Sequence, residues 1–235
     1  MDDNPRRFLS QKELLQLHGH DYAARFERRH GRRRLLQLIA LMKLDRSYDV
    51  ADFGCGNGLL AAEIHELVRT YTGVDFSEPF IELAVARAAR LDATNVRFVH
   101  SSIEDFCQRN PERFDAAFAL DFSEHVYDDM WLKIARSIRH TLKRGGTLYV
   151  HTPNADFFLE RMKTRRFILR HSAEHVAVRS LADNARLLES AGFRISSSQY
   201  VPHYNVLRFM HVLTPLPYVG RHFQARIFMA AVRTN

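Results

Sequence analysis

The feature that most constrains the fold is a glycine-rich turn between a short apolar run and a helix-like segment. Residues 48–53 (Tyr-Asp-Val-Ala-Asp-Phe) read as a buried strand, and residues 59–68 have the composition of a helix. Gly54, Gly56 and Gly58 alternate along the turn between them. Glycines let the backbone pass where a Cβ would collide with a ligand, and the amides of the helix's first turn then face that ligand. This segment predicts a ligand-binding turn, with an ordinary ligand-free turn as the plainer alternative.

The turn does not fit the dinucleotide fingerprint G-x-G-x-x-G, because its third glycine would fall at position 59, which is Leu. Three alternate glycines, with Asp52 two residues before the first, instead resemble motif I of the class I S-adenosylmethionine-dependent methyltransferases. The resemblance implies an α/β, Rossmann-like, seven-stranded sheet that is mostly parallel, with its last strand antiparallel and helices on both faces. It implies S-adenosylmethionine as the cofactor, and it places these motif residues beside it: Asp52, Gly54, Cys55, Gly56 and Gly58.

Length and composition set broad bounds. A chain of 235 residues suits a single domain with a full core. No apolar run approaches the roughly 20 residues that a membrane-spanning helix needs, and no secretory pattern is expected at the start. Two cysteines cannot support a disulfide framework, so a reducing cytoplasm is the expected location. The formal net charge of +7 hints at an anionic partner, although a solvated arginine face explains it equally well.

Residues 1–45 are predicted to form an N-terminal helical arm that is broken near Gly19 and Gly31. Several of its arginines fall three or four residues apart on one face, and we interpret most of them as solvated: Arg25, Arg28, Arg29, Arg32 and Arg33. Arg34 is treated separately. In families that resemble this chain, an arginine about this far before the glycine turn contacts the methionine carboxylate of the cofactor.

Two further strands are predicted to end near the cofactor. Residues 71–77 read as the second strand, with Asp75 at its carboxyl end, where open α/β sheets bind ligands. In the family this acidic residue accepts hydrogen bonds from both ribose hydroxyls. Phe76, beside it, is also predicted to contact the cofactor. Residues 96–100 read as the third strand. In the family a Gly-Asp pair and an apolar residue follow this strand, and here the corresponding residues are Ser101, Ser102 and Ile103. Ser102 is therefore expected to accept a hydrogen bond from the adenine amine, and Ile103 to flank the adenine ring.

The fourth strand, residues 114–120, runs into a polar stretch that we expect to carry the chemistry. Leu120 ends the strand at the cofactor, and Asp121, Glu124 and His125 follow at i, i+3 and i+4. One helical turn would bring these three side chains together as a half-site for Mg²⁺ or Mn²⁺. The stretch is similar to one shared by ubiquinone-pathway O-methyltransferases and small-RNA 3′-end 2′-O-methyltransferases. Alternatively, Asp121 or Ser123 caps a helix, while Glu124 and His125 only shape a pocket.

Four residues are candidates for catalysis: His125, Glu124, His151 and His175. His151 ends the predicted fifth strand, residues 147–151, and His175 lies in a segment that folds over the acceptor in relatives. A histidine suits removal of a hydroxyl proton at neutral pH. A structural role for an isolated histidine is the alternative.

The rest of the chain completes the predicted sheet. Helices are expected over residues 131–142, 156–170 and 180–191, and an antiparallel pair of strands over 193–200 and 223–232. Residues 202–221, apolar and basic, lie between these last two strands. We interpret them as a lid over the acceptor, with an oligomer contact or a peripheral membrane-surface patch as alternatives.

The sequence therefore predicts O-methylation of a small-molecule hydroxyl. RNA methylation is an alternative suggested by the positive charge, but the arginine face lacks the interleaved aromatic side chains that stack on bases. A non-catalytic subunit that binds S-adenosylmethionine is the alternative from a different class.

Overall fold

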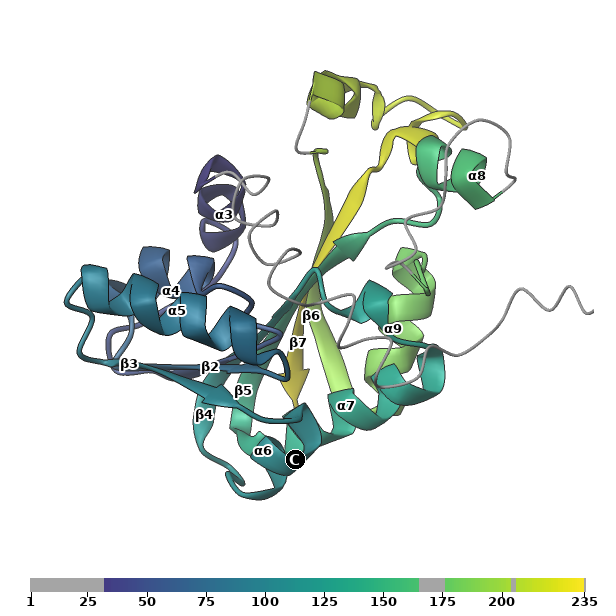
Figure 1. Cartoon of the computed structure of the whole chain (residues 1–235). Helices are drawn as coiled ribbons and strands as arrows, with labels where there is room; N and C mark the ends of the chain where they lie inside the picture. The colour runs from purple at the N-terminus through teal and green to yellow at the C-terminus, as the bar shows by residue number, and fades with distance from the viewer. Residues whose placement is uncertain (1–31, 165–175, 204–205, 235) are drawn as a thin grey trace, which may run out of the picture.

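A computed structural model describes residues 32–164, 176–203 and 206–234, which hold one seven-stranded sheet (Figure 1). The strands are β1 (Asp49–Phe53), β2 (Thr70–Asp75), β3 (Val96–His100), β4 (Phe114–Leu120), β5 (Leu142–Pro153), β6 (Phe193–Val201) and β7 (Arg226–Arg233). Their order in the sheet is β3-β2-β1-β4-β5-β7-β6. Strand β7 pairs antiparallel with both neighbours, and the other pairs are parallel. The predicted sheet, mostly parallel with an antiparallel last strand, is confirmed.

Helices cover both faces of the sheet. The α-helices are α3 (Arg32–Ile39), α4 (Leu59–Ile64), α5 (Glu78–Arg90), α6 (Ile103–Gln108), α7 (Asp128–Thr141), α8 (Phe158–Thr164) and α9 (Leu181–Ser190). The 3-10 helices are η1 (His65–Leu67), η2 (Ser123–His125), η3 (Val206–Leu213) and η4 (Gly220–Phe223). Figure 1 shows α3, α4 and α5 on one side of the sheet and α6, α7 and α9 on the other.

Strand β4 illustrates how the two faces are packed. Successive side chains of a strand point to opposite faces. Ala116 and Phe118 contact the apolar cluster under α3 and α4, whereas Ala117 and Ala119 contact the cluster under α6, α7 and α9. A strand buried on both faces needs apolar residues at nearly every position, which is why this stretch reads as a continuous apolar run.

Some element boundaries differ from those predicted. The predicted fifth strand, residues 147–151, is longer in the structure, where β5 runs from Leu142 to Pro153. Gly145 has a φ of 77°, and the β4–β5 register shifts between Phe114 and Ala116, so the strand pairing is irregular near the start of β5. Helix α6 was not predicted. It begins after Ser102, whose Oγ accepts a hydrogen bond from Asp105 N at 3.1 Å and caps the helix.

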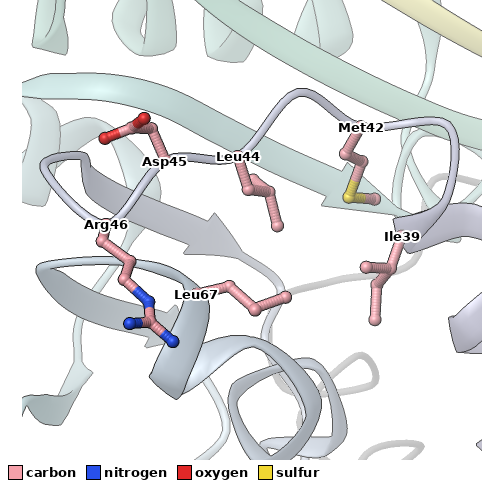
Figure 2. Close-up of a pocket in the computed structure, with 6 residues that line it drawn as sticks. All are labelled: Ile39, Met42, Leu44, Asp45, Arg46 and Leu67. Carbon is pink, nitrogen blue, oxygen red and sulfur yellow. The ribbon is translucent and has the colours of Figure 1, made fainter.

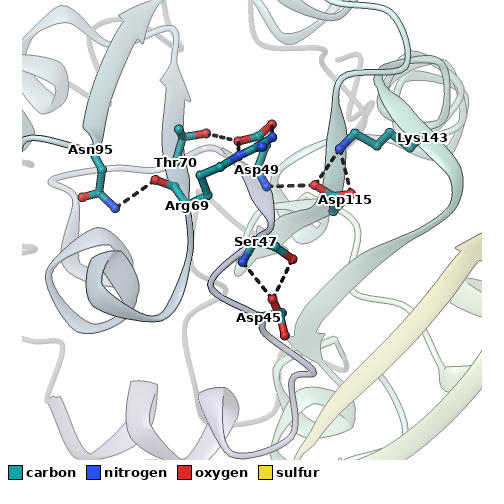
Figure 3. Close-up of polar contacts among 8 residues, drawn as sticks. All are labelled: Asp45, Ser47, Asp49, Arg69, Thr70, Asn95, Asp115 and Lys143. Carbon is teal, nitrogen blue, oxygen red and sulfur yellow. Dashed lines mark hydrogen bonds and ion pairs between the residues drawn. The ribbon is translucent and has the colours of Figure 1, made fainter.

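Polar contacts join the strands at their amino ends (Figure 3). Arg69, just before β2, donates from Nε to Asp49 Oδ1 of β1 at 2.9 Å. Lys143 of β5 contacts both carboxylate oxygens of Asp115 of β4 at 2.8 Å. Asp49 N also donates to Asp115 Oδ2, so β1, β2, β4 and β5 are connected at this end. The predicted site residues stand at the other end, which we call the carboxyl edge.

Part of the predicted N-terminal arm can be placed. Arg25, Arg28, Arg29 and the candidate His175 lie outside the described residues. Arg32 is exposed and pairs with Glu63 of α4, with Nε and Oε1 2.8 Å apart. The predicted lid, residues 202–221, contains η3 and the first two residues of η4.

Candidate active site

The glycine turn joins β1 to α4 and needs glycine for its backbone and for its packing. Gly54, Gly56 and Gly58 have φ values of 71°, 51° and 72°, a region that side chains disfavour. A Cβ at Gly54 would lie 2.7 Å from Phe122 Cδ2, and one at Gly58 would lie 2.8 Å from Phe98 Cζ. The backbone of the turn therefore packs closely against Phe98 and Phe122, and the turn lies at the carboxyl edge.

Asp75 connects the end of β2 to this turn. Its Oδ2 accepts a hydrogen bond from Gly56 N at 2.9 Å, and its Oδ1 accepts one from Ser77 N at the same distance. The side chain is buried, and Phe76 beside it is 38% exposed. The structure therefore places the predicted ribose-binding carboxylate against the predicted cofactor turn.

Asp52 and Cys55 lie behind the turn, inside the fold. Asp52 is 4% exposed and accepts a hydrogen bond from the Tyr71 hydroxyl. Burial raises the pKa of Asp52 to about 7, the Tyr71 hydrogen bond lowers it, and the nearby Asp75 charge adds to the rise. Burial also raises the pKa of the Cys55 thiol well above its usual value. These two predicted cofactor residues support the turn from within.

The residues after β3 and β4 flank the same edge. Ser102 is exposed, and its hydroxyl oxygen caps α6. Ile103 is buried in the core cluster under α6, so its side chain packs inside the protein. Leu120 ends β4 opposite His151 of β5.

Asp121 follows β4 in a conformation that prevents the predicted helical turn. Its φ is 53°, and its backbone N donates to His151 O at 2.7 Å. The carboxylate contacts Arg34 of α3, Arg226 of β7 and His151. A non-glycine residue with positive φ is costly and persists where surrounding contacts hold it, as these do.

His151 is held by partners on both ring nitrogens. Nδ1 lies 2.9 Å from Asp121 Oδ1, and Nε2 lies 3.2 Å from Arg226 Nε. Because arginine can only donate, Nε2 must accept, which puts the imidazole hydrogen on Nδ1, facing Asp121. Burial, followed by the charges of Arg226 and Arg34, lowers the pKa of His151 well below 6.5. His151 is therefore neutral, and its lone pair is already used.

Glu124 joins the same buried group. It is 1% exposed, and its Oε2 accepts a hydrogen bond from Thr152 Oγ1 at 3.1 Å. Its Oε1 lies 3.7 Å from Arg226 Nη2, so one guanidinium contacts both this carboxylate and Asp121. We call this set the Arg226 network: Arg34, Asp121, Glu124, His151 and Arg226.

The helical turn that was predicted to bring Asp121, Glu124 and His125 together as a metal half-site does not form. Only Ser123–His125 form a 3-10 turn, and Asp121 precedes it in a left-handed conformation, so the three side chains do not share a helical face. Arg34 and Arg226 supply the positive charge beside Asp121. Across residues 32–164, 176–203 and 206–234, no group of three His, Cys, Asp or Glu side chains is arranged to hold a metal ion.

Arg179 holds the loop that carries Glu124 and His125. Its side chain is 5% exposed and donates to Ser123 O, Val126 O and Asp128 Oδ1, each at 2.7 Å. Ala177 N also donates to Glu124 O at 3.1 Å. His125 is half-buried in this loop, at the carboxyl edge.

Sequence reasoning missed Arg179 and Arg226. Arg226 lies 105 residues from Asp121, and Arg179 lies 56 residues from Ser123. The available signal was a charged residue in an apolar context, since Arg226 stands between Ala225 and a run of apolar residues.

The structure also has a cavity of about 460 Å³, which lies away from the residues at the carboxyl edge (Figure 2). It is lined by Ile39, Met42, Leu44, Asp45, Arg46 and Leu67. These residues precede β1 and β2, so the cavity lies at the amino ends of the strands. It is separate from the carboxyl edge and adds nothing to the site.

Known proteins similar to this chain share its fold. Geranyl diphosphate C-methyltransferase from Streptomyces coelicolor A3(2), in complex with Mg²⁺, geranyl diphosphate and S-adenosyl-L-homocysteine, aligns with a TM-score of 0.65 and 14% identity, over 92% of this chain and 83% of its own. Magnesium protoporphyrin IX methyltransferase from Synechocystis PCC 6803, with bound SAH, aligns with a TM-score of 0.63 and 16% identity, over 97% of this chain and 90% of its own. At these identities the likeness shows the fold.

Sequence comparisons carry the assignment. The ubiquinone biosynthesis O-methyltransferase of Serratia proteamaculans (strain 568) is 35% identical over 107 residues, which is 45% of this chain and 42% of that protein. The match therefore spans less than half of the relative's length. A family model described as a methyltransferase domain matches residues 26–198, well over half of the chain. The chain belongs to this methyltransferase family.

Proposed function

We propose that this enzyme methylates a hydroxyl group of a small-molecule acceptor. The observation that carries the proposal is a half-buried histidine, His125, beside a buried carboxylate, Glu124, in a loop at the carboxyl edge. Histidine is the side chain best suited to take a hydroxyl proton near neutral pH. The partial match to ubiquinone biosynthesis O-methyltransferases supports a hydroxyl acceptor.

The residues at the carboxyl edge fit the cofactor chemically. The glycine turn leaves backbone at the edge without side chains, and Asp75 offers carboxylate oxygens for ribose hydroxyls beside it. Arg34 offers a guanidinium for the methionine carboxylate, and Phe76 offers an exposed ring next to Asp75. When bound, S-adenosylmethionine supplies an activated methyl group, so the protein's main task is to align the two reactants.

The candidate catalytic residues divide into two roles. His125 is the proposed base. His151 and Glu124 are positioning residues, because hydrogen bonds and ion pairs in the Arg226 network already engage them. Asp121 pairs with Arg34 in this structure, and the methionine carboxylate would compete with it for that guanidinium.

The proposal is tested with isotopically labelled S-adenosylmethionine and a panel of phenols, alcohols, amines and carbon acids, with products read by mass spectrometry. Labelled methyl on oxygen is expected, and it should be lost in His125→Ala and retained in His140→Ala, a control on α7. Methyl transfer only to nitrogen or carbon, or an unchanged rate in His125→Ala, would overturn it.

A further inference from the structure

Exposed apolar side chains gather in the segment between β6 and β7. The described residues expose eleven large apolar side chains, and five of these fall between positions 209 and 219. We call these five the apolar tip: Phe209, Val212, Leu216, Tyr218 and Val219. Tyr218 is 95% exposed and Val212 is 76% exposed. Single exposed apolar residues are ordinary, but a cluster of this kind marks a surface that meets another apolar phase.

A hydrogen-bonded turn holds the tip in this arrangement. Gly220 N donates to Leu216 O at 2.9 Å, and Leu216 N donates to Leu213 O at 3.1 Å. A Cβ at Gly220 would lie 2.2 Å from Thr214 O, so only glycine fits there. Tyr218 has a φ of 61°, which turns its side chain outward at a conformational cost. Local structure thus displays the apolar side chains, although burying them would be more favourable in water.

The tip stands beside the carboxyl edge. The two strands that carry it end their pairing at Val201 and Arg226, and Arg226 belongs to the network around Asp121. Helix α8 packs against the base of the segment, with the rings of Phe158 and Phe223 6.0 Å apart. Figure 1 shows η3, η4 and α8 together at one end of the sheet.

The surroundings of the tip are basic. No Asp or Glu follows Glu189 in the sequence, whereas Arg208 and Arg221 flank the tip. Arg221 is exposed, as is Arg161 on the neighbouring α8. A second copy docked through this face would bring two basic surfaces together, so the charge favours an anionic occupant over self-association.

We propose that the apolar tip docks on an anionic lipid membrane, with its apolar side chains entering the boundary between headgroups and acyl chains. Aromatic and aliphatic side chains flanked by Arg and Lys are the composition of such interfacial contacts. Anionic headgroups attract nearby Lys and Arg side chains electrostatically. No helix in the described part of the chain is long and apolar enough to span a membrane. Docking brings the carboxyl edge close to the lipid surface.

The test measures co-sedimentation of the full chain with vesicles of phosphatidylcholine alone or mixed equally with phosphatidylglycerol. Wild type should bind the anionic vesicles, and added salt should weaken the binding. The variant Val212→Ser/Leu216→Ser/Tyr218→Ser should lose at least about tenfold in partitioning, or about 1.4 kcal/mol. The matched control Val85→Ser/Leu91→Ser, which replaces apolar residues 51% and 45% exposed at α5, should bind like wild type.

Two results would overturn the proposal. One is equal sedimentation of wild type and the tip variant. The other is a wild-type dimer that the tip variant converts to monomer, without vesicle binding by either. Titration with S-adenosylhomocysteine separates this proposal from the proposed function, because the tip variant should keep wild-type affinity. Membrane docking does not depend on which atom is methylated.

Discussion

At the scale of single residues, the site depends on buried ionisable groups whose protonation the fold controls. Asp52 and His151 are both buried, and each is pushed toward its neutral form. Burial disfavours charge, which raises the pKa of an acid and lowers that of a base. Two residues that look reactive in the sequence therefore serve as hydrogen-bonding groups.

Asp52 makes stability depend on pH in a defined direction. Its pKa rises from 3.8 to about 7 on folding, so the folded protein holds this proton more tightly than the unfolded chain. The resulting stabilisation is full below pH 3.8 and is lost as pH rises through about 7. Asp52→Asn cannot ionise and keeps an oxygen for the Tyr71 hydroxyl. Relative to this variant, wild type should lose on the order of a few kcal/mol across that window, measured by urea unfolding.

Tyr71→Phe provides the control for this assignment. The Tyr71 hydrogen bond lowers the pKa of Asp52, so its removal should shift the window to higher pH. An Asp52→Asn protein with the same pH dependence as wild type would contradict the assignment.

Substitutions of His125 and His151 should have different effects on the catalytic rate and on its pH dependence. His151 is neutral across the neutral range, so His151→Gln should lower turnover without moving the midpoint of the profile. His125→Gln should lower the rate by about a hundredfold or more, because it removes the proposed base. If His151→Gln shifts the midpoint instead, His151 takes the proton and the proposed roles must be exchanged.

At the scale of elements, the loop after β4 is positioned by side chains from other segments. Phe122 in this loop contacts the place where a Gly54 side chain would lie, and Arg179 binds the loop's carbonyl groups. The loop has only one short 3-10 turn of its own, so these contacts define its geometry.

Gly54→Ala should therefore cost more than a glycine substitution elsewhere with the same backbone conformation. Gly54 and Gly145 both have φ values above 70°, but a Cβ at Gly145 meets nothing within 4 Å. Gly145→Ala should cost about 1 kcal/mol for the conformation. Gly54→Ala should cost roughly 1–3 kcal/mol more, because its Cβ would press on Phe122. Equal losses in denaturant unfolding would show that Phe122 yields without cost.

Arg179→Lys should loosen the loop while keeping the charge. Lysine cannot reproduce the three-way contact of the guanidinium, so at least one buried carbonyl loses its partner, at about 1–3 kcal/mol. Hydrogen exchange at residues 123–128 should quicken, and the catalytic rate should fall by about tenfold or more. Arg186→Lys is the matched control, since Arg186 is 72% exposed and pairs only with Asp183 among the contacts described. Unchanged exchange in Arg179→Lys would rule out this role.

At the scale of the whole molecule, the proposed site takes residues from segments that are distant in the sequence. The glycine turn after β1, Asp75 at the end of β2, the loop after β4, Arg34 of α3 and Arg226 of β7 all lie at the carboxyl edge. A ligand that contacts several of them should stabilise the fold as a unit, because it binds the folded state alone.

S-adenosylhomocysteine should therefore raise the free energy of unfolding by about 2.7 kcal/mol at one hundred times its dissociation constant. A micromolar constant is expected, and Asp75→Asn should weaken it, because an amide cannot accept as many hydrogen bonds as a carboxylate. Calorimetry and thermal unfolding check both statements, with NAD as the control ligand. Stabilisation by NAD and not by S-adenosylhomocysteine would contradict the placement of the cofactor.

Local patterns in the sequence determined the order of the strands, most of the helices and the glycine turn at the site. An apolar run, three alternate glycines and a helix-like segment specify a strand, a turn and a helix because each depends on neighbours within a few residues. The resemblance to the methyltransferase family implied the mostly parallel sheet, its antiparallel last strand and the cofactor.

Only the tertiary structure decided what the polar residues at the carboxyl edge do. Asp121 was expected to bind a metal, but packing brings Arg34 and Arg226 to its carboxylate. His151 was expected to act as a base, but burial and Arg226 keep it neutral and occupied. These outcomes depend on contacts between residues as far as 105 positions apart. Such contacts form only when the sheet is assembled, and sequence spacing carries no record of them.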